Sequence, residues 1–164
     1  MHKMLIVADD LTGAADCAAV CAHDGTEPVV LLSLTGEQDR PIALPEASVI
    51  SIDANTRRLS AVDAAETTAA LLEACQSSVA EDCIFFKKVD STLRGNIAAE
   101  LAAALRVRRT RTGATSILMA PAFPRHGRTT QAGMQRVHGR LLEHPDTWIN
   151  EPAVARSDIA EILS

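Results

Sequence analysis

The sequence predicts an α/β protein in which helices pack on both faces of a mostly parallel β-sheet, giving three layers. Short apolar runs that end in polar residues are typical of strands buried on both faces. Helical segments rich in small apolar residues follow several of these runs, as in β-α-β units. Aromatic residues make up only 2% of the chain, so Ala, Leu, Val and Ile must fill the core. The predicted strands cover residues 5–8, 28–34, 49–53, 83–86 and 115–120.

Three helices are predicted between these strands. The first covers residues 12–23, and the second continues from the N-cap Ser60 to about residue 80, with Asp63 as a capping-box partner. The third covers residues 97–105. The expected core-facing residues are Val62, Ala65, Ala69, Leu72, Cys75 and Val79 in the second helix and Ile97, Leu101 and Leu105 in the third.

The character of the sequence changes after residue 121, where Pro, Gly, His and Arg become frequent. Residues 128–142 are expected to form an irregular hairpin, and Ser157-Asp158 is expected to cap a short last helix that continues to Leu163. The length of 164 residues suits one domain with one core. Because the chain stops within a helical pattern, we expect it to be a truncated part of a longer protein.

Composition and charge disfavour several classes of partner. The net charge of −5 gives no electrostatic reason to expect nucleic-acid binding. No apolar run is long enough to span a membrane, so no membrane partner is expected either. The four cysteines show no zinc-ligand spacing and are expected to be small buried side chains in the cytoplasm. The basic run at residues 106–111 is interpreted as a solvated helix end.

Polar segments follow four of the predicted strands, at residues 9–16, 55–57, 87–96 and 121–128. In open parallel sheets, ligands bind beyond the carboxyl ends of the strands, so these segments are expected to meet at one site. Carboxylates there can act as general bases, and Lys and Arg can hold a substrate carboxylate. The mixture suits a small polyhydroxy acid better than an apolar ligand.

Purely structural roles compete with these interpretations. Either Asp9 or Asp10 could cap the following helix, because neighbours on an extended chain point opposite ways. Only one of Lys87 and Lys88 is expected to face the site. His126 lies in a loop where exposure to solvent explains its polarity equally well. The sequence contains neither a P-loop nor a dinucleotide-binding fingerprint, and the adjacent acids lack the D-x-D spacing of aspartyl-phosphate phosphatases.

Three segments together resemble the motifs of the four-carbon acid sugar kinase family. They are residues 8–16 (ADDLTGAAD), residues 87–96 (KKVDSTLRGN), and residues 120–124 (APAFP) followed by Gly127-Arg128-Thr129 and Gly133. The resemblance implies a cytoplasmic bacterial enzyme that phosphorylates the terminal hydroxyl of threonate, erythronate or 3-oxo-tetronate with ATP and a divalent metal, taken as Mg²⁺.

The resemblance also implies two α/β domains. Residues 1–164 are similar to the N-terminal domain, which holds the acid sugar, whereas a C-terminal domain absent from this sequence supplies most of the ATP site. Catalysis by this chain alone is therefore not expected, and the chain could serve as an acid-sugar-binding module without chemistry. A metal-dependent phosphatase built on the adjacent acids is a further alternative. The particular tetronate and the formation of a homo-oligomer are left open.

The site residues follow from combining the resemblance with the strand-end chemistry. Asp9 or Asp10 is expected to take the proton of the substrate hydroxyl or to help hold the metal, and no residue is assigned as a dedicated metal ligand. Lys87, Arg94 and Arg128 are expected to neutralise the substrate carboxylate or the moving phosphoryl group, with Arg57 as a further anion contact. The other expected substrate-binding residues are Lys88, Asp90, Ser91, Asn96 and Gly127.

Overall fold

A four-stranded parallel sheet forms the centre of the computed structural model, which describes residues 3–23, 25–32, 43–80, 82–113, 115–144, 147–148 and 155–164. The strands lie in the order β2-β3-β1-β4. Each neighbouring pair is parallel and in register, so all four carboxyl ends meet at the same edge. The strands are β1 (Met4–Ala8), β2 (Val29–Leu32), β3 (Val49–Asp53) and β4 (Ile84–Lys88).

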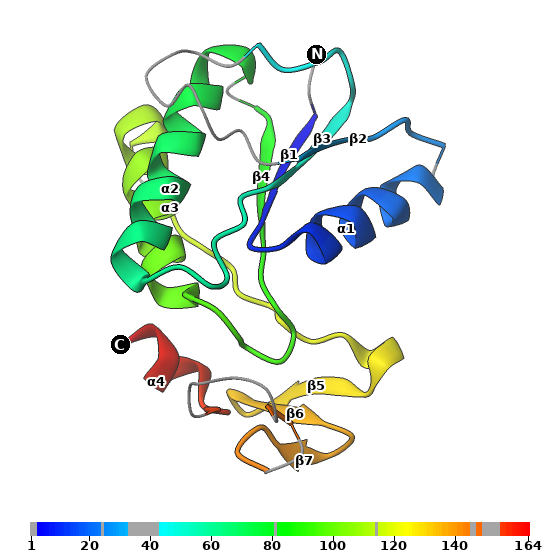
Figure 1. The fold of residues 1–164 in the computed structure, drawn as a ribbon, viewed down its shortest axis with the longest axis vertical. Coiled ribbons are helices and arrows are strands. Elements are labelled where there is room, and N and C mark those ends of the chain that lie inside the picture. The colour runs from blue at the N-terminus through cyan, green and yellow to red at the C-terminus, as the bar shows by residue number, and fades with distance from the viewer. Residues whose placement is uncertain are drawn as a thin grey trace.

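Helices cover both faces of this sheet, as the sequence predicts (Figure 1). One helix, α1, lies on one face, and α2 and α3 lie on the other, which confirms the three-layer α/β/α fold. The helices are α1 (Leu11–His23), α2 (Ala61–Cys75), α3 (Ile97–Thr112) and α4 (Ile159–Leu163), with a 3₁₀ turn η1 (Gln76–Ser78) after α2.

The main core fills the layer between the sheet and the helices α2 and α3. Alternate strand residues such as Val7 and Ile52 point into it, opposite Leu72 of α2 and Val107 of α3. On the other face, small residues let α1 approach closely: the hydroxyl of Ser51 donates a 2.8 Å hydrogen bond to the carbonyl of Ala14. The Ala-rich composition is thus used mainly for close helix–sheet packing.

A small antiparallel sheet lies beyond the carboxyl edge of the main sheet (Figure 1). It consists of β5 (Arg128–Gln131), β6 (Met134–Val137) and β7 (Arg140–Leu141), and a 3₁₀ turn η2 (Pro124–His126) precedes it. The predicted hairpin is therefore confirmed, with a third short strand added. A second apolar cluster joins this small sheet to α3 and α4; its buried residues are Leu93, Ile97, Leu101, Leu142 and Ala155.

One predicted strand is absent, and two predicted helices differ in detail. Residues 115–120 form no strand; they return from α3 towards η2, and Leu118 is 94% exposed (Figure 1). Four of the six residues expected on the core face of the second helix are buried, namely Ala69, Leu72, Cys75 and Val79. Val62 is instead 66% exposed, and the buried face also includes Ala64 and Thr68. Helix α3 continues seven residues beyond the expected end at residue 105. Residues 33–34 of the expected second strand lie outside the described part of the chain.

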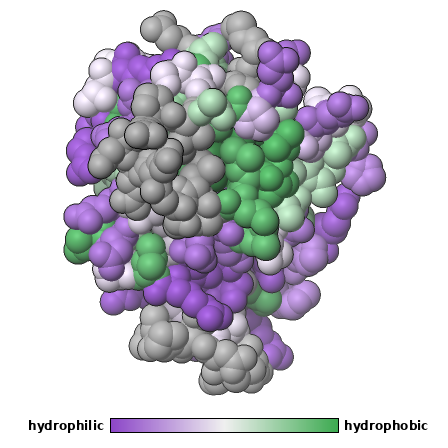
Figure 2. Space-filling view, turned by 45° about the horizontal axis from the view of Figure 1, so that its top comes forward, coloured by the Kyte–Doolittle hydropathy of each residue, from purple (hydrophilic) through white to green (hydrophobic). Residues whose placement is uncertain are grey.

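Apolar side chains also reach the surface, and Figure 2 shows such a patch on one face of the molecule. Val20 and Leu32 are both more than half exposed. Within the described residues, none of the helices combines the length and the apolar character needed to cross a bilayer.

Candidate functional site

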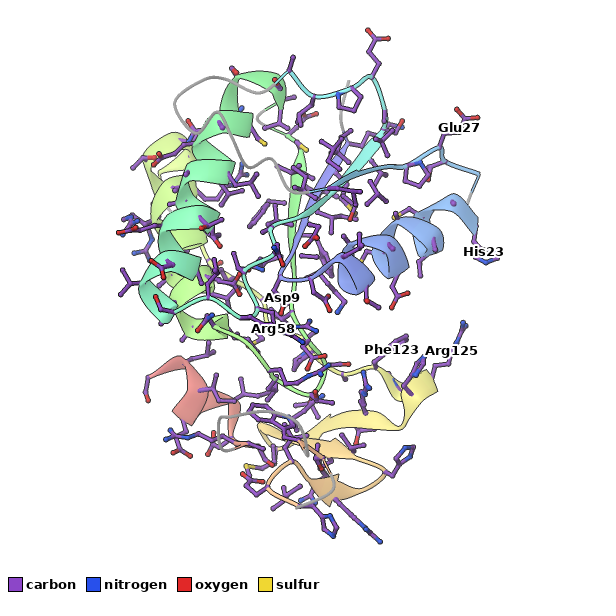
Figure 3. All side chains as sticks on the ribbon, in the orientation of Figure 1. Asp9, His23, Glu27, Arg58, Phe123 and Arg125 are labelled. Atoms are coloured by element: carbon purple, nitrogen blue, oxygen red, sulfur yellow. The ribbon has the colours of Figure 1, made fainter. Side chains whose placement is uncertain are left out.

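The carboxyl ends of β1, β3 and β4 bring the predicted polar segments together. Asp9 and Asp10 follow β1, residues 54–59 follow β3, and residues 89–96 follow β4. Figure 3 shows Asp9 at the edge of the main sheet that faces the small sheet. This edge is where open parallel sheets bind their ligands.

Asp9 and Arg57 form a two-pronged ion pair at this edge. Arg57 Nε donates to Asp9 Oδ2 at 2.7 Å, and a terminal nitrogen of Arg57 donates to Asp9 Oδ1 at 3.0 Å. Asp9 is only 2% exposed, so both of its oxygens are held away from water. Burial alone lowers the pKa of Arg57, but the hydrogen bond and charge of Asp9 outweigh burial and raise it. The guanidinium is therefore a permanent cation.

Asp10 is bound to the same guanidinium but has a second task. Its Oδ2 accepts a 2.5 Å hydrogen bond from Arg57, and its Oδ1 accepts a 2.8 Å hydrogen bond from the Gly13 N–H in the first turn of α1. Asp10 therefore caps the helix, as one of the two acids was expected to do. Its side chain is 28% exposed, against 2% for Asp9. Of the two carboxylates, that of Asp10 is the one open to a ligand.

The loop of residues 54–59, here called the Arg57 loop, extends the pairing of β1 with β3. The N–H groups of Thr56 and Arg57 both donate to the carbonyl of Asp9, at 3.0 and 3.1 Å. Asn55 adopts a left-handed conformation with φ of 50°, and its N–H is bound by Asp53 Oδ1 at 2.8 Å. These contacts place the Arg57 side chain beside the two acids.

Gly95 lies against the same ion pair. Its φ is +88°, and a Cβ atom there would stand 3.1 Å from Asp9 Oδ2. The backbone after β4 therefore passes close to the acids only because residue 95 has no side chain.

A second ion pair joins Asp90 and Arg94 in the loop after β4. Arg94 Nε donates to Asp90 Oδ2 at 2.7 Å, and the Thr92 hydroxyl donates to the same oxygen. Burial alone raises the pKa of Asp90, but the hydrogen bonds from Arg94 and Thr92 outweigh burial and lower this pKa to about 2. The Arg57 charge acts in the same direction. Gly95, which follows Arg94, lies against Asp9 and Arg57, so the two ion pairs are neighbours.

Arg128 connects the small sheet to this loop. One of its terminal nitrogens donates a 2.6 Å hydrogen bond to the Ser91 hydroxyl. The fully buried Gln135 donates from Nε2 to the Ser91 carbonyl at 2.7 Å. The predicted residues Asp9, Asp10, Arg57, Asp90, Ser91, Arg94 and Arg128 thus form one continuous polar region.

The two lysines of β4 point to opposite faces of the sheet, as expected for neighbours on a strand. Lys88 lies on the α1 side, where its stem approaches Gly13 and its ammonium donates to the Val89 carbonyl at 2.7 Å. Lys87 points into the core layer, where its Nζ lies 3.1 Å from Glu100 Oε1. Its side chain is 4% exposed, so the structure places Lys87 outside the polar region that it was expected to join.

Asn96 and Gly127 lie near the site with structural contacts of their own. Asn96 Nδ2 donates to the carbonyls of Thr56 and Leu59, at 3.2 and 3.0 Å. Gly127 has a φ of +66°, and a Cβ atom there would stand 2.3 Å from the His138 ring. Contact of these two residues with a sugar remains a prediction.

Glu100 and Gln135 were not predicted from the sequence, and Thr56 was predicted only as part of the polar segment at residues 55–57. Glu100 is 1% exposed and accepts a hydrogen bond from the Thr56 hydroxyl. Its position between Ile97 and Leu101 on the buried side of α3 was the available signal.

A metal centre does not emerge from the described residues, which contain no group of three or more His, Cys, Asp or Glu side chains arranged around a common point. Both oxygens of Asp9 and both of Asp10 already accept hydrogen bonds. In this arrangement the partners of the two acids are Arg57 and the Gly13 N–H.

Comparisons with known proteins agree with a sugar-binding site. A family model described as a sugar-binding N-terminal domain matches residues 4–164. The chain is 40% identical over 160 residues to a D-threonate kinase of Cupriavidus necator and 34% identical over 147 residues to a D-erythronate kinase of Heliobacterium modesticaldum. These alignments cover 98% and 89% of this chain but 36% and 32% of the two relatives. The chain therefore spans about a third of the length of these relatives.

Solved structures share the fold. A domain of unknown function from Bordetella bronchiseptica, crystallised with bound citrate as a domain-swapped dimer, is 33% identical with a TM-score of 0.78, and the match covers 98% of this chain and 39% of that one. A Haemophilus influenzae protein at 22% identity has a TM-score of 0.79, over 98% of this chain and 38% of that one, and shows likeness in fold alone. With the family model matching nearly every residue, this chain belongs to the family of sugar-binding N-terminal domains.

Proposed function

We propose that this chain is the substrate-binding domain of a kinase that phosphorylates the terminal hydroxyl of a four-carbon acid sugar. The observation that carries the proposal is the continuous polar region at the carboxyl edge of the sheet, in which Arg57 joins Asp9 to Asp10. Arg94 and Arg128 add two further cations beside it. A small anion with several hydroxyl groups matches this mixture of cations, carboxylates and hydroxyls.

The proposed roles divide by exposure. Asp9 is buried and holds Arg57, whereas Asp10 is open enough to meet a substrate hydroxyl. In the proposed reaction, Asp10 accepts the proton of the terminal hydroxyl of the sugar acid. The oxygen of that hydroxyl attacks the γ-phosphorus of ATP. The bond between that phosphorus and the β–γ bridging oxygen breaks, and ADP leaves. Arg94 and Arg128 hold the substrate carboxylate.

D-threonate is the first substrate to test. The D-threonate kinases of Cupriavidus necator and Salmonella typhimurium are 40% and 36% identical to this chain, against 30% for the 3-oxo-tetronate kinase of Pectobacterium atrosepticum. The Bordetella bronchiseptica domain was crystallised with bound citrate, and the part that matches this chain covers 39% of it. That domain's swapped dimer also supports a homo-oligomer for the present protein.

ATP and Mg²⁺ belong to the proposed reaction but not to the polar region described above. The relatives are kinases about three times as long as this chain, which supports a phosphoryl donor bound mainly by further sequence. By this proposal the chain alone binds the acid sugar without phosphorylating it.

The test is a kinase assay on a longer protein that carries this domain. Asp10→Asn is expected to lower kcat for D-threonate by about 10²-fold or more, because the general base is lost. Asp82→Asn is the matched control, since Asp82 is exposed just before β4, at the opposite edge of the sheet. Equal turnover of the Asp10 variant and the control would overturn the base assignment, and no turnover of any four-carbon acid sugar by the unaltered protein would overturn the function.

A further inference from the structure

A buried ion pair lies directly behind the Arg57 loop. Glu100 in the first turn of α3 is 1% exposed, and the side chain of Lys87 on β4 is 4% exposed. The two charges are 3.1 Å apart, yet Lys87 Nζ has no hydrogen-bond partner among the described residues. Such pairs are a poor source of stability, because the cost of removing both charges from water offsets their attraction. The pair therefore calls for another role.

Glu100 is connected to the loop that carries Arg57. Its Oε1 accepts a hydrogen bond from the Thr56 hydroxyl, and the Thr68 hydroxyl of α2 approaches the same oxygen at 3.5 Å. Thr56 directly precedes Arg57 and is fully buried. The same oxygen of Glu100 thus faces the Lys87 ammonium at 3.1 Å and the Thr56 hydroxyl.

The Thr56 peptide is fixed on every side. Its N–H donates to the Asp9 carbonyl at 3.0 Å, and its carbonyl accepts from Asn96 Nδ2 at 3.2 Å. Its side chain is bound by Glu100. The backbone just after β1 and the first turn of α3 therefore bind Thr56 from two directions. The preceding Asn55 has a φ of 50°, a conformation that the surrounding contacts must maintain.

We infer that Glu100, Lys87, Thr56 and Asn96 are positioning residues that fix the Arg57 loop, and thereby the guanidinium that joins Asp9 to Asp10. Their effect on ligand affinity rests on the proposed acid-sugar site, whereas their effect on the loop does not. The four residues come from β4, the Arg57 loop, and the N-cap and first turn of α3, so the packing of α3 on the sheet sets the geometry of the site.

The chain offers a matched pair of variants for the test. Thr56→Val and Thr68→Val each remove one hydroxyl from Glu100 Oε1, but only Thr56 lies on the Arg57 loop. Amide hydrogen exchange is measured by NMR on the 164-residue chain at the Thr56 and Arg57 N–H groups. Thr56→Val is expected to speed exchange at Arg57 by about tenfold relative to Thr68→Val, and Thr56→Ser is expected to restore the slow rate.

The affinity for the acid sugar is the second measurement. The Kd for D-threonate is expected to rise about tenfold in Thr56→Val and to stay near the unaltered value in Thr56→Ser and Thr68→Val. Equal exchange rates and equal affinities in the two valine variants would show that the cluster is merely structural. If the unaltered chain binds no acid sugar, the proposed function fails, but the exchange rates still decide the positioning role. Should Thr56→Val not fold, Asn96→Ala replaces it in the exchange experiment, because Asn96 holds the other side of the same peptide.

Discussion

Arg57 brings the adjacent acids Asp9 and Asp10 into one cluster, although neighbours on an extended strand normally point to opposite faces. Its three nitrogens are all used: Nε and one terminal nitrogen bind Asp9, and the other terminal nitrogen binds Asp10. Lysine could not reproduce this fork, because its ammonium is a point charge. In the proposed site Arg57 therefore orders the acids, and Arg94 and Arg128, which are bound to Asp90 and Ser91, hold the substrate anion.

Asp90 gives a prediction about pH. Its pKa is lowered from 3.8 to about 2 in the folded chain, so its ion pair with Arg94 stabilises the fold above pH 4 and this contribution is lost as the pH falls towards 2. We expect Asp90→Asn to lower the unfolding free energy by about 2 kcal/mol at pH 7. The difference between the variant and the unaltered chain should shrink between pH 4 and pH 2 in urea titrations. A difference that stays constant over this range would contradict the ion-pair account.

At the scale of single residues, the sequence predicted which charged residues lie at the carboxyl edge of the sheet, but not which of them bind one another. Asp9, Asp10, Asp90 and Arg94 were found from their positions after strands, because the ends of parallel strands necessarily meet. Their pairing could not be found, since it depends on side-chain directions that sequence spacing does not determine. Glu100 was missed for a related reason, because a charged residue on a helix is normally solvated.

At the scale of elements, the start of α2 shows how a local signal becomes structure. The Ser60 hydroxyl oxygen accepts from the Asp63 N–H at 3.2 Å, which confirms the predicted N-cap. The Asp63 carboxylate does not complete the expected reciprocal box; instead it accepts from the Ser60 hydroxyl at 2.7 Å. The Arg57 loop leads directly into this cap, so α2 limits how far the loop can move.

The cap gives a prediction about stability. Ser60→Ala is expected to lower the unfolding free energy by about 1 kcal/mol, because one N–H at the start of the helix loses its acceptor. Ser60→Asp keeps a side-chain acceptor and serves as the control, with an expected change of only a few tenths of a kcal/mol. Urea denaturation followed by circular dichroism measures both. Equal losses in the two variants would show that the hydroxyl does not stabilise the helix.

Strands and helices were predictable where the alternation of apolar and polar residues was clear. The strand at residues 49–53 was predicted with its observed bounds because the largely apolar run of residues 49–52 lies between the polar residues Ser48 and Asp53. Residues 115–120 are equally apolar but form no strand, and an apolar run of this length cannot be distinguished from an extended connection by its pattern alone. Val62 was misplaced on the core face of α2 because alanines on several sides blur the apolar stripe.

At the scale of the whole molecule, α3 links the two apolar clusters. Ala103, Ala104 and Val107 pack into the main core, whereas Ile97 and Leu101 pack against the small sheet and α4. The polar region lies between these two cores, at the turn where α3 begins. The sequence predicted a single core, whereas the buried residues form two clusters, because the second cluster combines residues from distant segments. The Ser91–Arg128 hydrogen bond crosses this junction.

Calorimetric titration of the 164-residue chain tests the central claim, which is that this polar region binds a small sugar acid through its carboxylate. D-threonate is expected to bind, with an affinity that falls as salt is added. Threitol, which has the same carbon chain without a carboxylate, is expected not to bind measurably. Arg94→Ala is expected to abolish most of the heat with D-threonate. Equal binding of threitol and D-threonate, or no binding of D-threonate at low salt, would contradict the account.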